Sequence, residues 1–600
     1  MNNRLFLIFT LILIYGLPLH YVFAASSSGM GTELSPALQQ QIKILSQEKA
    51  DRTPAQKKMD SQLIYALKIK HKDPVMNSLP MLRASVDIDP EGTVLVDITA
   101  TVTDDLLTQI RDIGGTVINS FVKYNAVRAR LPLDAIETLA DNPDIRFIRP
   151  AVRALLNKVN TSEGDVAHSA PIARSTYHVD GTDIKVGVMS DSVDYLAAVQ
   201  ATGDLPTVTV LEDAPGNSGE GTAMLEIVYD LAPAAKLYFA TAWTGPAGFA
   251  TNIEALADAG CDIIVDDIYY YNESPFQDDI ISQAVNTVTA NGVLYFSSAG
   301  NAGNYNDGTS GTWEGDYNGV ANTNDSLYHD SIHDFGGGDT LNRITNSTNS
   351  FFYTLFWADP LGGAGNDYDF YVVSPDGSSI IMSAENVQDG NDDPYEAISA
   401  TGDPQDYQII IAKWSGADVF IHFSTNRGLL ELNTTGQMSG HPCAVDAFAV
   451  AAVSANGKTD AFTGSESVES FSSDGPRRVF FNSNGTAITP GDFSSTGGTL
   501  RQKPDIAAAD GVMCATPGFN PFYGTSAAAP HTAAIAALML EANNTLTIAD
   551  VKDAFSATAF DIEGSGWDRD SGYGLIMADA LISYISHIEP EPVIIGPAVD

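Results

Sequence analysis

Short, mostly apolar runs recur along two parts of the chain, and segments with helical periodicity follow several of them. The runs occupy residues 184–189, 235–240, 263–266, 293–298 and 447–453. Continuous apolar runs of this length are typical of strands that are buried on both faces of a parallel sheet. The pattern therefore predicts an α/β fold whose polar residues of interest follow the strand ends.

The region before these runs has its own strand and helix pattern. The predicted order is βαββαβ, with elements at residues 93–99, 104–112, 116–131, 133–140 and 145–148. Gly114-Gly115 is expected to end the first helix. Residues 25–155 are therefore predicted to be a leader followed by a small α+β domain. The charged, helix-prone stretch 34–72 is expected to be a loosely structured leader.

Residues 306–435 interrupt the α/β pattern. They are rich in Gly, Asn and Asp and carry short strand-like runs at 351–357, 368–373, 407–414 and 419–423. Several short strands separated by turn residues predict an inserted β-sandwich, which we expect to fold separately from its flanks. Acidic turns at 366–369 and 389–393 offer oxygen ligands of the kind that Ca²⁺ prefers, and the alternative is solvation at the surface. No other cofactor is indicated.

The chain is strongly acidic. Its 600 residues include 75 Asp and Glu against 31 Lys and Arg, which gives a formal net charge of −44 at pH 7. Such a chain should repel nucleic acid and anionic membranes, so neither is expected as a partner. An acidic medium would neutralise part of this charge.

The N-terminus predicts export. Residues 1–24 have a basic start, an apolar stretch and a Val-Phe-Ala end, which is typical of a signal peptide. We therefore expect a secreted protein, extracellular or periplasmic, without a membrane anchor. The three cysteines, Cys261, Cys443 and Cys514, leave at least one thiol unpaired and show no metal-ligand spacing. The sequence leaves undecided whether Cys443 and Cys514 form a disulfide. Residues 586–600 are expected to be a C-terminal tail.

Ser526 stands where a long apolar helix is predicted to begin. The sequence Gly-Thr-Ser-Ala-Ala-Ala-Pro-His at 524–531 leads into an apolar run that ends at Leu540. Unpaired backbone N–H groups in a first helical turn can stabilise an oxyanion beside the hydroxyl, although a serine there can also simply cap the helix. The segment resembles the nucleophile segment of the subtilisin-like serine peptidases. This resemblance implies a doubly wound, mostly parallel sheet in residues 170–305 and 436–585.

Two further segments are similar to that family. Residues 184–189 lead into Ser190-Asp191-Ser192, which resembles the aspartate strand and implies Asp191 as the acid. Ser190 is one residue more than the usual pattern has, so Asp194 is a second candidate. A carboxylate after a strand is also a common turn or helix-cap residue. Residues 292–303 resemble the segment that supplies the oxyanion-hole asparagine, which is Asn301 here.

The histidine of the family is replaced. Residues 219–233 have the layout of the His-Gly-Thr helix, but Glu220 stands at the histidine position. This helix resembles that of the sedolisins, which share the fold and use a glutamate as the base. Sedolisins carry an aspartate one turn later, where this chain has Met224. The second acid must then come from elsewhere, and Asp191 is the first choice and Glu226 the second.

A glutamate base needs a raised pKa. Its ordinary pKa of about 4.3 makes it a weaker proton acceptor than histidine, near 6.5. Burial or a second carboxylate that shares one proton can raise it, and Asp191, Asp266 and Asp267 are the candidates. Asp267-Ile268-Tyr269 also stands where the family has a substrate-pairing segment. Asp267 therefore lines a substrate pocket, tunes Glu220 or is solvated.

These expectations describe a secreted serine endopeptidase that hydrolyses polypeptides at mildly acidic pH. Ser526 attacks the carbonyl, Glu220 carries the proton, Asp191 holds Glu220, and Asn301 with the Ser526 N–H binds the oxyanion. The resemblance also implies that residues 25–155 include a propeptide that inhibits the enzyme, and the alternative is a permanent N-terminal domain. The alternative is an inactive secreted binding protein that acts through its β-rich insert.

Overall fold

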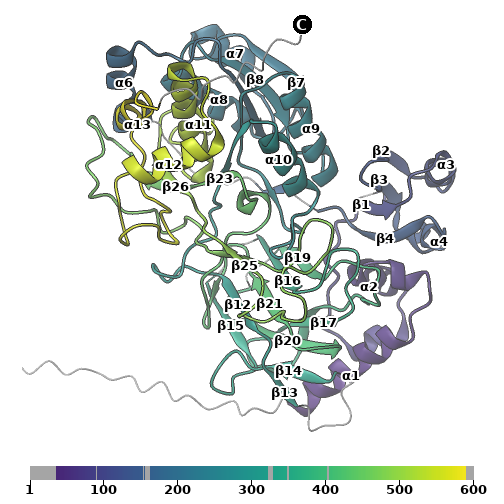
Figure 1. Ribbon diagram of the computed structural model, residues 1–600. Helices are drawn as coiled ribbons and strands as arrows, with labels where there is room; N and C mark the ends of the chain where they lie inside the picture. Colours follow the sequence, from purple (N-terminus) through teal and green to yellow (C-terminus); the bar gives the residue numbers. More distant parts are fainter. Residues whose placement is uncertain are drawn as a thin grey trace, which may run out of the picture.

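The computed structural model describes residues 35–89, 91–152, 154–155, 163–321, 329–346, 350–401 and 404–588. The expected signal peptide and residues 589–600 of the expected tail lie outside these ranges. Figure 1 shows an α/β region, a β-rich region beside it, and an N-terminal part that contacts both.

A seven-stranded parallel sheet forms the centre of the α/β region. Its strand order is β26-β23-β11-β9-β6-β8-β7, and each adjacent pair is parallel. The strands are β6 (Lys185–Ser190), β7 (Val208–Glu212), β8 (Lys236–Thr241), β9 (Ile263–Asp266), β11 (Leu294–Ser298), β23 (Ala447–Ser454) and β26 (Ile506–Asp510). The parallel sheet predicted from the apolar runs is thus confirmed.

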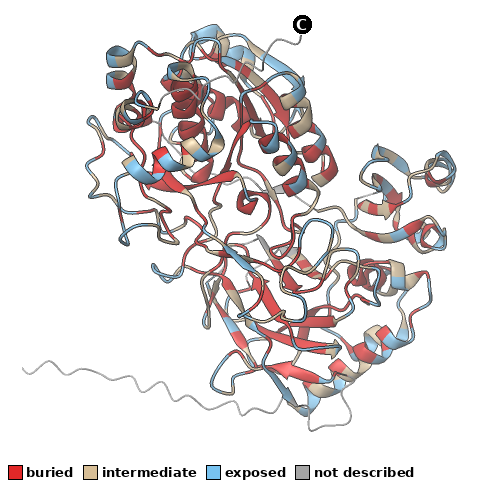
Figure 2. Cartoon of the chain, in the orientation of Figure 1, coloured by how far each residue is buried: buried red, intermediate tan, exposed pale blue. Residues whose placement is uncertain are grey.

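Helices cover both faces of this sheet because its strands are apolar on both sides. Val186 and Val188 of β6 pack with one set of helices, whereas Met189 packs with the other. The first set is α5 (Gly164–Ala167), α6 (Ala170–Tyr177), α7 (Leu196–Thr202), α8 (Glu220–Leu231), α11 (Thr525–Ala542), α12 (Ile548–Thr558) and α13 (Ala578–Ile585). The second set is α9 (Pro246–Asp258) and α10 (Ile280–Ala290). In Figure 2, α8 and α11 are largely buried.

The predicted βαββαβ order before this region is also confirmed. Its elements are β1 (Thr93–Ala100), α3 (Asp104–Asp112), β2 (Thr116–Phe121), β3 (Ala126–Pro132), α4 (Ile136–Ala140) and β4 (Ile145–Pro150). The strands form a four-stranded antiparallel sheet in the order β2-β3-β1-β4. Leu63 and Ile64 of the preceding helix join its core.

The prediction of a loosely structured leader was wrong. Residues 36–70 contain α1 (Pro36–Ala50) and α2 (Ser61–Lys70), and short 3₁₀ turns occupy Gln56–Lys58 and Pro74–Ser78. Leu38, Ile42 and Leu45 of α1 are buried against the β-rich region. Their i, i+4, i+7 spacing is a helical stripe, which the high charge of this segment obscured.

The β-rich region contains two antiparallel sheets. One has the order β12-β21-β16-β19, and the other has the order β13-β14-β20-β15-β22, with β17 between β18 and β20. The strands are β12 (Thr312–Asp316), β13 (Gly319–Ala321), β14 (Ser331–His333), β15 (Asn342–Asn346), β16 (Ser350–Trp357), β17 (Asp367–Val373), β18 (Ile380–Ala384), β19 (Tyr395–Thr401), β20 (Gln408–Ser415), β21 (Phe420–Ser424) and β22 (Leu429–Leu430). Large apolar residues of both sheets share one core.

This core is not separate from the α/β region, contrary to our expectation. Phe276, Phe480 and Phe481, which lie outside residues 306–435, belong to the same cluster. Arg477, fully buried, pairs with Glu314 of β12. The β-rich region therefore depends on residues of the α/β region for part of its interior.

The acidic turns and the cysteines also have defined surroundings. Asp367 and Asp369 are buried and pair with Lys49, so neither is solvated, and Asp393 pairs with Arg149. All three cysteines are buried with free thiols, so the Cys443–Cys514 disulfide is not formed. Within the described ranges, no cluster of three or more His, Cys, Asp or Glu is arranged to hold a metal ion.

The shared core leads to a deletion prediction. Replacement of residues 306–435 by a short Gly/Ser linker should expose Phe276, Phe480 and Phe481 and leave the Arg477 guanidinium without Glu314. We expect loss of the cooperative thermal transition, measured by circular dichroism, because the three aromatic side chains that the β-rich region covers would face water. A deleted protein that still melts cooperatively and cleaves small peptides would contradict the shared core.

Candidate active site

The predicted site residues converge at the carboxyl edge of the parallel sheet. Asp191 follows β6, Asp267 follows β9 and Asn301 follows β11, while Glu220 and Ser526 lie in the first turns of α8 and α11. These two helices pack against each other on the same face of the sheet. The fold thus brings side chains from five separate segments to one edge of the sheet.

Ser526 lies in a rigid turn at the start of α11. Its side chain is fully buried, and the preceding Gly524 has φ of +111°, which favours glycine. The N–H of Gly524 donates to Asp510 Oδ2 at 2.9 Å. Burial raises the pKa of Asp510 to about 8. Asp510 was not among the predicted site residues, because nothing in the pattern of β26 distinguishes it from an ordinary strand-end residue.

Asn301 is fastened directly to the serine helix. Its Oδ1 accepts from the Thr525 N–H at 3.0 Å and from the Thr525 hydroxyl at 2.9 Å. The Gly300 N–H in turn donates to Thr525 Oγ1 at 3.1 Å. With Oδ1 held in this way, the Nδ2 end of the amide is directed away from Thr525. Thr525 therefore fixes the orientation of a donor next to Ser526, a function that its place in the motif did not indicate.

Glu220 and Asp267 form a buried carboxyl pair. Both residues have no exposed surface, and their side chains are hydrogen-bonded to each other. Burial raises the pKa of Asp267 well above its usual value, and the nearby charges of Asp191 and Asp266 raise it further. A hydrogen bond between two carboxyl groups requires a proton on one of them. Ser190, which was expected only as an extra residue before Asp191, is also buried here, and its hydroxyl lowers the pKa of Asp267.

Asp191 makes different contacts from those expected. Its oxygens accept from three backbone N–H groups, those of Ser192 at 2.6 Å, Ser218 at 2.5 Å and Glu220 at 3.0 Å. Asp191 therefore holds the backbone at the start of α8, where unpaired N–H groups attract a carboxylate. The carboxyl that bonds the Glu220 side chain is that of Asp267 instead.

The two alternative acids, Asp194 and Glu226, accept hydrogen bonds from nearby loops instead. Asp194 accepts from the Gly216 N–H at 2.8 Å. Glu226 accepts from the N–H groups of Ala515 and Thr516 and from the Thr516 hydroxyl. Both carboxylates thus secure loops around α8.

The expected substrate-pairing segment is only partly exposed. Asp267 and Ile268 are buried, so of the three uses weighed for Asp267 the geometry favours tuning Glu220. Tyr269 and Tyr270 form β10 (Tyr269–Tyr270), which pairs antiparallel with β5 (Ala154–Leu155). Tyr269 also lines a small pocket together with Asn301 and Arg427. Arg427 comes from the β-rich region, and no motif around it indicates that it reaches this site.

Buried histidines of the α/β region are used elsewhere. His441 bonds Asp266 at 2.9 Å and Glu273 at 2.7 Å, and these carboxylates raise its pKa well above the usual value. His531 Nδ1 bonds the Ala527 carbonyl at 2.7 Å, and burial lowers its pKa to about 3. Both ring nitrogens of His441 and Nδ1 of His531 therefore bond partners other than Ser526.

Comparison with known proteins identifies a family. The model of the subtilase family (Peptidase_S8) matches residues 209–574. Fervidolysin from Fervidobacterium pennivorans is 38% identical over 64 residues, which is 11% of this chain and 9% of that protein. The match therefore spans only a small part of that relative.

Solved structures are similar at low identity. The Clostridium perfringens CspB protease is 15% identical with a TM-score of 0.48, covering 71% of this chain and 97% of that chain. The crystal structure of fervidolysin is 15% identical with a TM-score of 0.37, covering 83% and 62%. The epidermin leader peptide processing protease from Staphylococcus aureus is 10% identical with a TM-score of 0.42, covering 82% and 99%. No described helix has both the length and the apolar character needed to cross a membrane.

The contacts of Asp191 lead to a stability prediction. Asp191→Asn replaces one accepting oxygen by an NH₂ group that faces backbone donors, so we expect a loss of about 1–2 kcal/mol in the free energy of unfolding. Denaturant titration of the variant in a Ser526→Ala background would measure it. Asp194→Asn is the control and should cost less, because the Asp194 carboxylate accepts from one backbone N–H, that of Gly216, and at 3.4 Å from the Ser192 hydroxyl. An unchanged midpoint for Asp191→Asn would contradict the capping role.

Proposed function

The chain belongs to the subtilase family, and from this membership we propose that it is a secreted serine endopeptidase in which Glu220 replaces histidine as the base. The observation that carries this proposal is the buried Glu220–Asp267 pair at the start of the helix that packs against the Ser526 helix. A carboxyl pair that shares one proton has the chemistry of an acid and a base at once.

The proposed steps use five groups. Glu220, ionised, takes the Ser526 proton while Oγ attacks the peptide carbonyl. Asn301 Nδ2 and the Ser526 N–H stabilise the oxyanion that forms, and Glu220 then returns the proton to the leaving amine. Asp267 keeps its own proton throughout and donates to Glu220. A water molecule then attacks the acyl-enzyme carbonyl. Glu220 takes the proton of this water and returns it to Ser526 Oγ as the acyl group is released.

The pair sets the pH range. At low pH both carboxyls are protonated and no base is present. At high pH the proton of Asp267 is lost, because the pH has passed its raised pKa, and two adjacent buried charges repel each other. Activity is therefore expected to be highest while the pair holds one proton, at about pH 4 to 6, and to decline as the second proton is lost.

A first activity prediction concerns the base. Glu220→Gln keeps the size of the side chain but removes proton transfer, so turnover of a peptide substrate should fall on the order of a thousandfold or more. A reactive-serine probe should then label Ser526 far more slowly than in the wild type. If the wild type itself is not labelled, the protein is inactive, and the binding-protein alternative gains support.

The same assay can separate the two possible partners of Glu220. Asp267→Asn should abolish or shift the alkaline limb of the kcat/KM profile, because the group that loses its proton there is gone. Asp191→Asn should change stability and leave that limb in place. The reverse result would assign the shared proton to Asp191.

A further prediction concerns maturation. The pairing of β5 with β10 supports a propeptide whose end lies along the substrate-pairing segment. We therefore expect self-cleavage within residues 156–162, which lie outside the described ranges and directly follow β5. N-terminal sequencing of the mature protein would locate the cut. A wild-type chain as intact as a Ser526→Ala chain would argue against self-processing.

A further inference from the structure

The first described helices cover one face of the β-rich region. Apolar residues of α1 and α2 pack against strands β14, β17, β18 and β20 in one closed cluster. The N-terminal members are Leu38, Ile42, Leu45, Tyr65, Leu79 and Leu82, and their partners include Ile332, Tyr371, Val373, Ile380 and Ile410. Without α1, this sheet face would be exposed to water.

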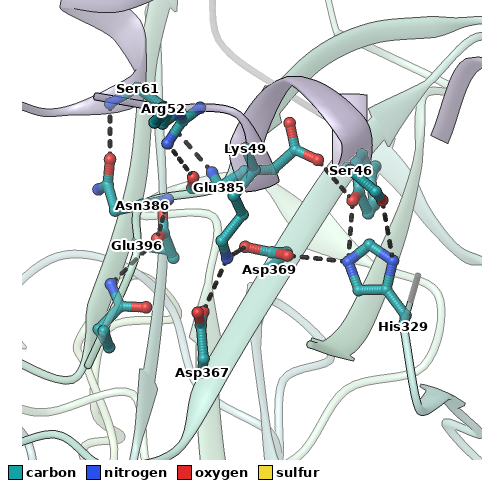
Figure 3. A network of polar contacts seen from close by, with 12 residues as sticks. Ser46, Lys49, Arg52, Ser61, His329, Asp367, Asp369, Glu385, Asn386 and Glu396 are labelled. Atoms are coloured by element: carbon teal, nitrogen blue, oxygen red, sulfur yellow. Dashed lines mark hydrogen bonds and ion pairs between the residues drawn. The ribbon is translucent and has the colours of Figure 1, made fainter. Parts of the chain in front are cut away.

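A buried cation lies beside this apolar contact. Lys49 of α1 extends between Asp367 and Asp369 of β17, with both Nζ–Oδ1 distances at 2.9 Å. Figure 3 shows the lysine bridging these two carboxylates. The lysine side chain is 1% exposed, and the two carboxylates are 2% and 0% exposed. Such a group is costly to bury unless it is paired, so the lysine and its carboxylates require each other.

Further contacts extend this cluster. His329 bonds Asp369 at 2.8 Å and lies 3.5 Å from Ser46 Oγ, as Figure 3 shows. Arg52 donates to the Glu385 carbonyl at 2.6 Å, and the Ser61 N–H donates to Asn386 Oδ1 at 2.6 Å. Both helices therefore bind the β-rich region through buried polar groups as well as apolar ones.

The N-terminal part is held together by its own core and also contacts the α/β region. α2 shares a core with strands β1 to β4, and the Asp60 N–H donates to the Ile148 carbonyl at 2.9 Å. Lys123, in the turn after β2, pairs with Glu254 of α9. Residues 35–152 therefore form one body with two attachment surfaces.

From these contacts we propose that the Lys49 cluster and its apolar surroundings on the β-rich region, rather than the contacts with the α/β region, supply most of the affinity with which residues 35–152 are held once the chain is cut beyond β5. The docking itself does not depend on catalysis, although its consequence for a matured enzyme rests on the proposed function. In that enzyme a single cut would leave β5 paired with β10. The anchor keeps the N-terminal fragment, which includes β5, at high local concentration next to β10.

The test uses the full chain with Ser526→Ala, so that failure of the catalytic proposal cannot affect it. The recognition sequence of a site-specific protease replaces residues 156–162, and the cut protein is run on size exclusion at neutral pH. We expect both fragments to elute together. Separate elution of the wild-type fragments would overturn the proposal.

Variants then test the anchor. Lys49→Met keeps the apolar stem and leaves Asp367 and Asp369 without their cation, so the dissociation constant should rise on the order of a hundredfold or more. The control is Lys70→Met, which removes an exposed ion pair with Asp134 inside the same fragment and should change nothing. The triple variant Lys49→Met/Asp367→Asn/Asp369→Asn should recover much of the affinity, because no uncompensated charge remains.

Each variant is first folded as an uncut chain, which keeps the N-terminal part tethered to its surface. If Lys49→Met nevertheless fails to fold, elution of the cut wild type and of the triple variant still decides the proposal. Binding by Lys49→Met as tight as that of the wild type would show that the apolar cluster alone holds the fragment, and the assignment of Lys49 as anchor would be wrong.

Discussion

Two carboxyl groups that are buried together cannot both carry a charge, and the arrangement of the site depends on this constraint. Glu220 and Asp267 have no exposed surface, and burial raises the pKa of Asp267 well above its usual value. Asp191 is close enough to raise the pKa of Asp267, yet its own charge is stabilised by three backbone N–H groups at the start of α8. The oxygens of Asp191 are thus occupied by backbone donors, whereas Glu220 and Asp267 form a buried carboxyl pair.

Elsewhere the chain balances its buried carboxylates with scarce cations. Only 31 basic residues accompany 75 acidic ones, so a buried Lys or Arg identifies a contact that the fold cannot easily lose. Lys49 joins the N-terminal helices to the β-rich region, and Arg477 joins that region to the α/β region. Buried ion pairs thus lie at two junctions between the three parts, around Lys49 and around Arg477.

Sequence reasoning predicted what depends on local pattern. The parallel strands follow from apolar runs, and the βαββαβ unit follows from period and turn residues. Ser526, Glu220 and Asn301 were found through motifs. The partner of Glu220 was harder to predict, because Asp191 and Asp267 both follow strands and only the packed structure shows which oxygens are occupied by backbone donors. The docked α1 and the shared core around Phe276 depend on contacts distant in sequence, for which a single sequence gives no signal.

The frame around position 220 explains how a glutamate can stand where relatives have a histidine. Gly219 has φ of +77°, and a Cβ on Gly221 would lie 2.7 Å from the Ser192 carbonyl oxygen and 2.4 Å from the Phe239 ring. Glycines at both neighbours, together with the Asp191 oxygens, therefore fix the backbone of residue 220 regardless of its side chain. The position of the side chain at residue 220 is thus set by the start of α8, whereas the pairing that we propose for its carboxyl involves Asp267. Since these two contributions come from different residues, the side chain at this position can change while the fold is kept.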